Sequence, residues 1–206
     1  MNLKRNLAAK KNQLRMLHSK AEISEMMSNT LISWLPEVPR EYVIVCVGTD
    51  RSTGDAFGPL TGYFLSELKP KHIHVHGTLK NPVHATNMED HVSHIKNTYR
   101  RPYVIAVDAC LGKASSVGHL ISGLGSIKPG AALNKSLPEI GDIHITGVVN
   151  VSGFMEHSVL QNTRLSVVVD MAKKAADILY NVDQALTYQI TSPSIVMQRK
   201  HHESSI

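Results

Sequence analysis

The fold of this 206-residue chain is decided by one stretch, YVIVCVGTDRSTGDAFGPLTGYFL, which spans residues 42–65. A run of mostly β-branched apolar residues is followed by a polar break with two glycines, and then by apolar residues at helical spacing from Phe57 onward. This order predicts a buried parallel strand, a turn and a crossover helix. The loop after such a strand lies at the carboxyl edge of an open α/β sheet, where ligand sites form. We therefore expect a functional site at this loop.

The chemistry of the loop argues against nucleotide binding. A phosphate-binding loop has a lysine and a hydroxyl residue directly after its last glycine, whereas Gly54 is followed by Asp55. A carboxylate close to the start of a helix also repels phosphate. Two interpretations of Asp55 remain: it caps the helix that follows, because Asp is a favoured cap residue, or it is a functional carboxylate.

A second carboxylate follows another short apolar run, YVIAVDACLG at residues 103–112. We expect this run to be a strand with Asp108 at its carboxyl end. Its similar build predicts that it neighbours the first strand in a parallel sheet, so that Asp55 and Asp108 open onto the same crevice. Two carboxylates that can share a proton are suited to general acid and base catalysis.

Three stretches resemble, in order and approximate spacing, successive motifs of the spore germination protease: VGTDRSTGDAFGP at residues 47–59, AVDA at 106–109 and GSIKPGAALNK at 125–135. The resemblance extends from about Tyr42 to the C-terminal helix. It implies that Asp55 and Asp108 are the catalytic aspartates of a sporulation protein. It also implies a protein or peptide substrate, such as the small acid-soluble spore proteins.

The wider fold group that this resemblance implies includes the hydrogenase maturation peptidases. These enzymes use an acid at each of the two positions and a histidine further along the chain to hold a metal. That histidine position falls near Asn150, with His144 and His157 close to it in the sequence. An asparagine in place of the family's histidine favours the metal-free aspartate version, so we expect no cofactor and no bound metal. The metal-binding peptidase is the alternative.

The length of the chain is sufficient for one α/β domain with a substantial core. We predict a three-layer α/β sandwich with a mainly parallel central sheet over residues 39–190. The family resemblance makes this fold phosphorylase/hydrolase-like, as in the hydrogenase maturation peptidases. A helical N-terminal arm is expected over residues 1–38 and a mobile tail over residues 191–206.

The location is expected to be the cytoplasm, and by the family resemblance that of the developing spore. No apolar run in the sequence approaches the length of a membrane span. The basic N-terminus also lacks the apolar stretch of a signal peptide.

The basic charge is concentrated near the N-terminus. The chain carries a net charge of +5, and the first twenty residues hold six basic and no acidic side chains, Lys4, Arg5, Lys10, Lys11, Arg15 and Lys20. Residues 2–35 favour helix, and we expect an extension that packs on the domain or on another subunit of a homo-oligomer. Contact with nucleic acid or an anionic membrane is the alternative, although interleaved aromatic residues are lacking.

Histidines and cysteines offer further candidate ligands. His72, His74 and His76 alternate along a predicted strand, and His91 and His94 lie one turn apart on a helix predicted over residues 86–97. Each group can bind metal or form a solvated surface, and the spacing does not close a ligand set.

Cys46 and Cys110 form no CxxC pair and are expected to be reduced, packed thiols. A nucleophilic Cys110 is the alternative, but no histidine in the sequence is evidently placed to activate it.

Further strands are predicted at residues 118–123 and 142–151, followed by one or two helices with a boundary near residues 162–163. Between these strands, a glycine-rich segment that ends at Lys135 is expected to border the crevice. Lys135 can hold a substrate carboxylate or be solvated.

The sequence thus predicts an endopeptidase in which one of Asp55 and Asp108 activates water while the other, protonated, assists the carbonyl or the leaving amine. The competing prediction is a binding or regulatory module that keeps the peptidase fold without turnover.

Overall fold

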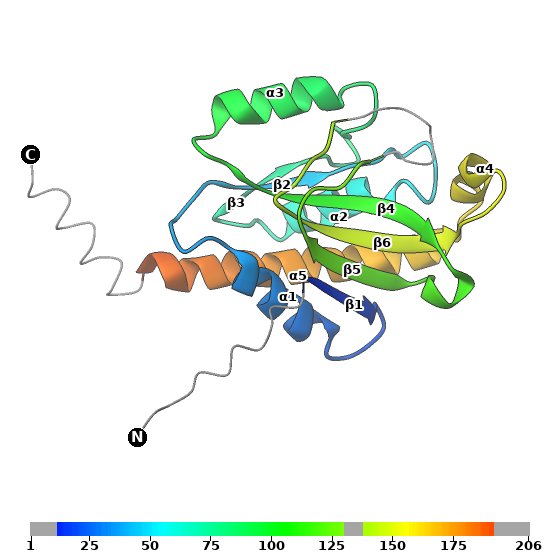
Figure 1. The fold of residues 1–206 in the computed structure, drawn as a ribbon, viewed down its shortest axis with the longest axis horizontal. Coiled ribbons are helices and arrows are strands. Elements are labelled where there is room, and N and C mark those ends of the chain that lie inside the picture. Colours follow the sequence, from blue (N-terminus) through cyan, green and yellow to red (C-terminus); the bar gives the residue numbers. More distant parts are fainter. Residues whose placement is uncertain (1–11, 130–137, 192–206) are drawn as a thin grey trace, which may run out of the picture.

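The computed structural model describes residues 12–129 and 138–191 as three layers built around one six-stranded sheet (Figure 1). The strands lie in the order β1-β5-β6-β4-β2-β3. Their bounds are β1 Gln13–Leu17, β2 Tyr42–Cys46, β3 Ile73–His76, β4 Tyr103–Gly112, β5 His119–Leu124 and β6 Ile143–Val151. The helices are α1 Ile23–Trp34, α2 Phe57–Glu67, α3 Met88–Thr98, α4 Glu156–Gln161 and α5 Leu165–Thr191, with a 3₁₀ turn at Ala114–Ser116. The predicted three-layer α/β sandwich with a mainly parallel central sheet is confirmed (Figure 1).

The sheet is mixed, with a parallel centre. β3, β2, β4 and β6 are parallel neighbours, whereas β5 pairs antiparallel with β6 and β1 pairs antiparallel with β5. Every residue of β2 is buried, because helices cover both faces of this part of the sheet. The continuous apolar run at this strand is typical of such a position.

Alternating side chains of β2 enter two separate cores. Ile44 and Cys46 pack with α1, α2 and α5 on one face, while Val43 and Val45 pack with Met88 and other residues on the face that α3 covers. α3 lies on one side of the sheet, and α1 and α5 lie on the other (Figure 1). Full burial of one such side chain stabilises the fold by about 1.5–3 kcal/mol, so β2 contributes substantially to both cores.

The predicted helix over residues 2–35 is confirmed at α1 but wrong for the described residues that precede α1. Gln13–Leu17 forms β1, an edge strand of the sheet, and the helix begins only at Ile23. Leu14 and Met16 pack against the core while Arg15 is exposed, a period of two that suits a strand. Hydrogen bonding to the open edge of β5 overrides the helix propensity of Leu, Arg and Met. The described part of the predicted arm therefore belongs to the sheet and the core, and residues 1–11 lie outside the described residues.

The other element predictions agree with the structure within a few residues. The boundary expected near residues 162–163 falls between α4 and α5. Cys46 is buried and Cys110 is half-buried, each as a free thiol. Among the described residues, no helix is both long enough and apolar enough to span a bilayer. Lys135 and residues 192–206 of the predicted tail lie outside the described residues.

Candidate functional site

The loop between β2 and α2 is folded tightly by its glycines. Gly48 has a φ of 145°, and a Cβ atom there would lie 2.0 Å from the backbone oxygen of Asp55. That same oxygen accepts a hydrogen bond from the Thr49 amide at 3.2 Å. The Gly54 amide donates to the Leu160 carbonyl on α4 at 2.9 Å. Because only glycine permits these approaches, the loop holds Asp55 at a fixed position beside α4.

Asp55 and Asp108 line one pocket, as the sequence predicts. The cavity measures about 480 Å³ and is bounded by the β2–α2 loop, by the segment before α3 and by α4. The structure thus brings together two acids that are 53 positions apart in the sequence.

Asp108 is not at the end of its strand, which corrects the sequence prediction. β4 continues to Gly112 and stays paired with β6, where Asp108 lies opposite Thr146. The ladder between β2 and β4, however, ends at the pair Cys46 and Val107. Asp108 is therefore the first residue of β4 beyond the end of β2, which leaves its carboxyl group free to face the pocket.

The environment of Asp108 disfavours its charged form. Burial of the carboxyl group raises the pKa of Asp108 well above its ordinary value, and the charge of Asp55 raises it further. A hydrogen bond at 2.9 Å from the Ala109 amide to Asp108 Oδ1 acts in the opposite direction. The residue keeps some exposed surface where it lines the pocket, yet its carboxyl group is desolvated by the surrounding protein.

Asp55 is less strongly perturbed. Burial raises the pKa of Asp55, while the Ser52 hydroxyl and the charge of His157 lower it. Ser52 is 5% exposed, and its hydroxyl makes no hydrogen bond of normal geometry in the described part of the chain, although it is close enough to Asp55 to affect the pKa of that carboxyl. The pKa of Asp108 is thus raised further above its ordinary value than the pKa of Asp55.

The capping interpretation of Asp55 is wrong. The cap residue of α2 is Ala56, and no side chain caps this helix by a hydrogen bond. The carboxyl group of Asp55 instead lines the pocket.

Only one of the three candidate positions for the family histidine lies at this pocket. His157, on α4, lines it and accepts a hydrogen bond from the Gln161 side-chain amide at 3.1 Å. His144 is absent from the lining, because its ring packs over Gly123 and its Nδ1 donates to the Gly125 carbonyl at 2.9 Å.

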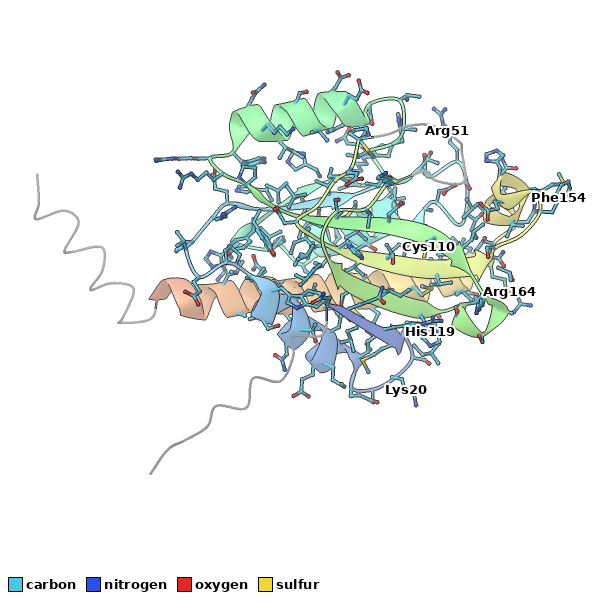
Figure 2. The ribbon with its side chains drawn as sticks, in the orientation of Figure 1. Lys20, Arg51, Cys110, His119, Phe154 and Arg164 are labelled. Carbon is cyan, nitrogen blue, oxygen red and sulfur yellow. The ribbon has the colours of Figure 1, made fainter. Side chains whose placement is uncertain are left out.

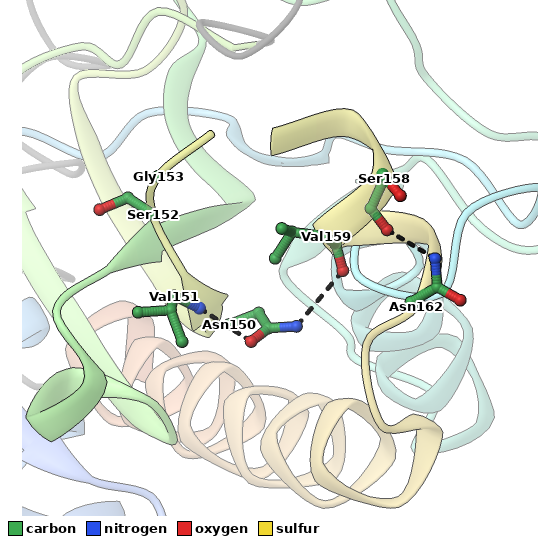
Figure 3. Close-up of a pocket in the computed structure, with 7 residues that line it drawn as sticks. All are labelled: Asn150, Val151, Ser152, Gly153, Ser158, Val159 and Asn162. Atoms are coloured by element: carbon green, nitrogen blue, oxygen red, sulfur yellow. Dashed lines mark hydrogen bonds between the residues drawn. The ribbon is translucent and has the colours of Figure 1, made fainter. Parts of the chain in front are cut away.

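Asn150 has a structural role. Its side-chain amide donates to the Val159 carbonyl at 3.3 Å and to Thr163 Oγ1 at 3.2 Å, which ties the end of β6 to α4 and the turn after it. Figure 3 shows this amide directed at the α4 backbone, in a hollow with Ser152 and Ser158.

The residues at the pocket do not form a metal site as they stand. Within residues 12–129 and 138–191, no three His, Cys, Asp or Glu side chains are arranged as ligands of one ion. The oxygens of Asp55 and Asp108 and the ring of His157 surround the pocket without converging on one point.

Cys110 lies near the site on β4 (Figure 2). Burial raises the pKa of its thiol to about 11, so the thiolate that a nucleophile requires is disfavoured.

His84 also lines the pocket, and the sequence did not predict it. It precedes α3 by four residues and belongs to no evident motif. Its position follows from a parallel bridge between Val47 and Val83 and from a hydrogen bond of 2.8 Å from the Gly48 amide to the Val83 carbonyl. These contacts place the segment before α3 along the Asp55 loop.

Comparison with known proteins places the chain in a family. The model described as "Protein of unknown function (DUF1256)" matches residues 15–178, and the chain belongs to this family. It is 49% identical over 168 residues to "Uncharacterized protein YyaC" of Bacillus subtilis (strain 168), a match that covers 81% of this chain and 82% of that protein.

Among solved structures, the NiFe hydrogenase maturation protease HycI from Thermococcus kodakarensis KOD1 is similar, with 19% sequence identity and a TM-score of 0.49. This match covers 70% of the present chain and 93% of the other. The resemblance to the spore germination protease stays a prediction.

Proposed function

We propose that this protein is a peptide-bond hydrolase that uses Asp55 and Asp108 as a pair. The observation that carries the proposal is the shared pocket in which the two carboxyl groups have unequal environments. Pairs of acids whose pKa values are separated by their surroundings are the usual basis for dividing acid and base roles at one site. Asp108 is then the proton donor and Asp55 is the carboxylate base.

In the proposed mechanism, Asp55 takes a proton from a water molecule as the water oxygen attacks the peptide carbonyl carbon. Asp108 donates its proton to the carbonyl oxygen, so the tetrahedral intermediate forms without net charge. When the C–N bond breaks, the proton on Asp55 passes to the leaving nitrogen, and a hydroxyl of the intermediate returns a proton to Asp108. Each carboxyl group ends the cycle in its starting state.

Ser52 is suited to position the substrate. Its hydroxyl is buried at the pocket beside Asp55 and lacks a hydrogen bond of normal geometry in the described residues. A substrate carbonyl or the attacking water can satisfy this hydroxyl. Lys135 is proposed to contact a substrate carboxylate.

The proposed substrate class is protein or peptide, and the proposed setting is sporulation. The sequence resemblance to the spore germination protease supports both, and it makes the small acid-soluble spore proteins the first substrates to test. Assembly of the protein as a homo-oligomer stays a prediction.

The proposal is tested by incubating the purified protein with small acid-soluble spore proteins and with a mixed peptide library. Wild type, Asp55→Asn and Asp108→Asn are compared, with Asp170→Asn, an exposed acid on α5, as the matched control. Cleavage by wild type and Asp170→Asn alone supports the proposal. No cleavage by any folded form favours the binding or regulatory module that keeps this fold.

A metal-dependent version is the second candidate, because His157 lies at the same pocket as both acids. This version requires side-chain movement, since the described residues present no formed ligand set. Elemental analysis decides: about one equivalent of zinc or nickel that is lost in Asp55→Ala and in His157→Ala supports it. We expect the protein to purify without stoichiometric metal.

A further inference from the structure

A second pocket adjoins the first and has a different chemistry. It measures about 510 Å³ and lies between the end of β3, the segment before α3, and α3 itself. Pro82 and His84 line both pockets and so form their common wall. The lining of the second pocket includes four histidines and one lysine, and it contains no Asp or Glu: His76, His84, His91, His94 and Lys80.

Three of the imidazoles come together from two elements. His76 ends the edge strand β3, while His91 and His94 lie on α3 one turn apart. The ring centroid of His76 is 6.3 Å from that of His91 and 6.0 Å from that of His94. The His76 Nε2 atom and the Tyr99 hydroxyl are hydrogen-bonded at 3.0 Å, which anchors the central ring.

The segment that carries His84 is held by local hydrogen bonds. The Asn87 side chain donates to the Pro82 carbonyl at 3.0 Å and accepts from the His84 amide at 2.8 Å. The Thr78 amide donates to the Asn81 carbonyl at 3.1 Å, which closes the turn that carries Lys80. These hydrogen bonds hold the wall of the pocket in place, so little entropy is lost on binding.

The imidazoles of this pocket have mainly other imidazoles as their charged neighbours, and few carboxylates lie near them. Burial lowers the pKa of His76, and the neighbouring His91, His94 and His74 lower it further. Burial, His94 and His84 lower the pKa of His91, and only Asp90 opposes them.

Burial raises the pKa of the hydroxyl of Tyr99, the hydrogen-bond partner of His76, and the charge of Glu41 raises it further. Asp90 and Glu41 do not line the pocket. A bound anion would supply the negative charge that the lining lacks.

We propose that this pocket binds an oxyanion, a phosphate or carboxylate group, through N–H donors of His76, His91 and His94 and the ammonium group of Lys80. Hydrogen bonds from cationic nitrogen to anionic oxygen are among the strongest in proteins. The anion can belong to a free phosphorylated molecule. It can also belong to an acidic side chain of a ligand that extends across Pro82 and His84 from the first pocket. The site does not depend on the proposed hydrolysis.

A transition metal fits this pocket less well than an anion. Two imidazoles on one tetrahedral ion, with metal–nitrogen bonds near 2.0–2.1 Å, have ring centroids about 5 Å apart, closer than those seen here. The residues that the structure describes contain no formed set of three metal ligands.

The first test is NMR of the histidine rings during titration with sodium sulfate, against sodium chloride at equal ionic strength. Sulfate keeps its charge between pH 5.5 and 8, so any pH dependence of binding belongs to the protein. We expect saturable shifts for His76, His91 and His94, with affinity at least about tenfold higher at pH 5.5 than at pH 8, because binding favours the protonated rings. His119, on β5 (Figure 2), and His144 are internal controls that should not respond.

Variants assign the site. His94 and Lys80 are exposed, so His94→Gln and Lys80→Gln should keep the fold and weaken sulfate binding about tenfold each. Lys96→Gln removes the same charge from an exposed position on α3 outside the pocket and should change affinity less than about twofold.

The two sources of the anion are separated by a competing ligand. An N-acetyl-triglutamate peptide that displaces sulfate indicates an acidic side chain, and a peptide that fails to displace it indicates a small free anion; each outcome requires the sulfate site. Equal responses to sulfate and chloride, unchanged binding in both His94→Gln and Lys80→Gln, or tight binding of zinc without sulfate binding would overturn the proposal. Activity toward peptides does not enter this test, so its result is independent of the proposed function.

Discussion

Two neighbouring pockets share the wall formed by Pro82 and His84 and carry opposite chemistry. The first holds two carboxyl groups whose pKa values are raised, and the second holds the rings of His76 and His91, whose pKa values are lowered. Burial is the largest cause in each pocket, and it favours the neutral form of an acid and of a base alike. Like charges add to it in both places.

Burial thus has opposite chemical consequences in the two pockets. Desolvation of a carboxyl group retains a proton, which makes an acid available for catalysis. Desolvation of an imidazole favours its neutral form, whereas an anion bound beside the ring favours the protonated form. The two pockets are thus expected to respond to pH in opposite directions, and the following predictions test that contrast.

The largest effect is expected from removing either carboxyl group. Asp55→Asn and Asp108→Asn should each reduce peptide hydrolysis by about 10²–10⁴-fold, because each removes one proton-transfer group. His94→Gln, in the second pocket, should leave hydrolysis of an uncharged peptide within about twofold of wild type. Initial rates on one fluorogenic peptide measure all three. Full activity of Asp55→Asn would remove Asp55 from the mechanism.

Next in size are the glycines that shape the two pockets. Gly48→Ala and Gly77→Ala should each destabilise the fold by roughly 3 kcal/mol or more, since a Cβ would lie 2.0 Å from the Asp55 oxygen and 1.9 Å from the Cys46 oxygen, respectively. Gly125→Ala, with a φ of 92° and open space around it, should cost about 1 kcal/mol.

Urea unfolding of the three glycine variants checks this order. Gly153→Ala is the control, because a Cβ there meets nothing within 4 Å. Equal stabilities of Gly48→Ala and Gly125→Ala would show that the loop does not need the close approach seen here.

A smaller effect concerns Asp108 and stability. A raised pKa in the folded state means that the unfolded chain releases this proton first, so stability falls as pH rises above about 3.9 toward the folded-state pKa. Asp108→Asn should therefore be more stable than wild type at neutral pH, by on the order of 1 kcal/mol, and similar to it near pH 3.5. Thermal unfolding at several pH values measures the difference, and a constant difference across pH would contradict the expectation.

The smallest effect belongs to the histidine pocket and has the opposite pH dependence. A lowered pKa of His91 in the folded state means that the unfolded chain binds the proton first, so stability is lost as pH falls below about 6.5. His91→Gln should gain a few tenths of a kcal/mol over wild type at pH 5 relative to pH 8. If the gain in stability of His91→Gln were larger at pH 8 than at pH 5, as is expected for Asp108→Asn, the two pockets would not differ in their response to pH.

Much of the first site could be predicted because its signals are local. The apolar run of β2, the glycine break and the helical spacing after Phe57 are contiguous in the sequence, and parallel neighbours bring their ends to one edge. Asp55 and Asp108 could therefore be placed together without a structure.

The rest depends on contacts between distant segments. β1 is a strand because the edge of β5 is open to it, and residues 13–17 alone favour helix. His84 reaches both pockets through the bridge of Val83 to Val47, which no spacing in the sequence indicates. The alternation of histidines along β3 is evident in the sequence, but the approach of His76 to α3 follows from how that helix packs on the sheet.

The proposed division of roles, with Asp108 as the proton donor and Asp55 as the base, can be measured by ¹³C NMR of the two side-chain carboxyl carbons during a pH titration. Asp108 should titrate at higher pH than Asp55, and Asp55→Asn should lower the pH at which Asp108 titrates because the charge of Asp55 is gone. Titration of both carboxyl groups near the ordinary aspartate value, with Asp108 unaffected by Asp55→Asn, would contradict this assignment.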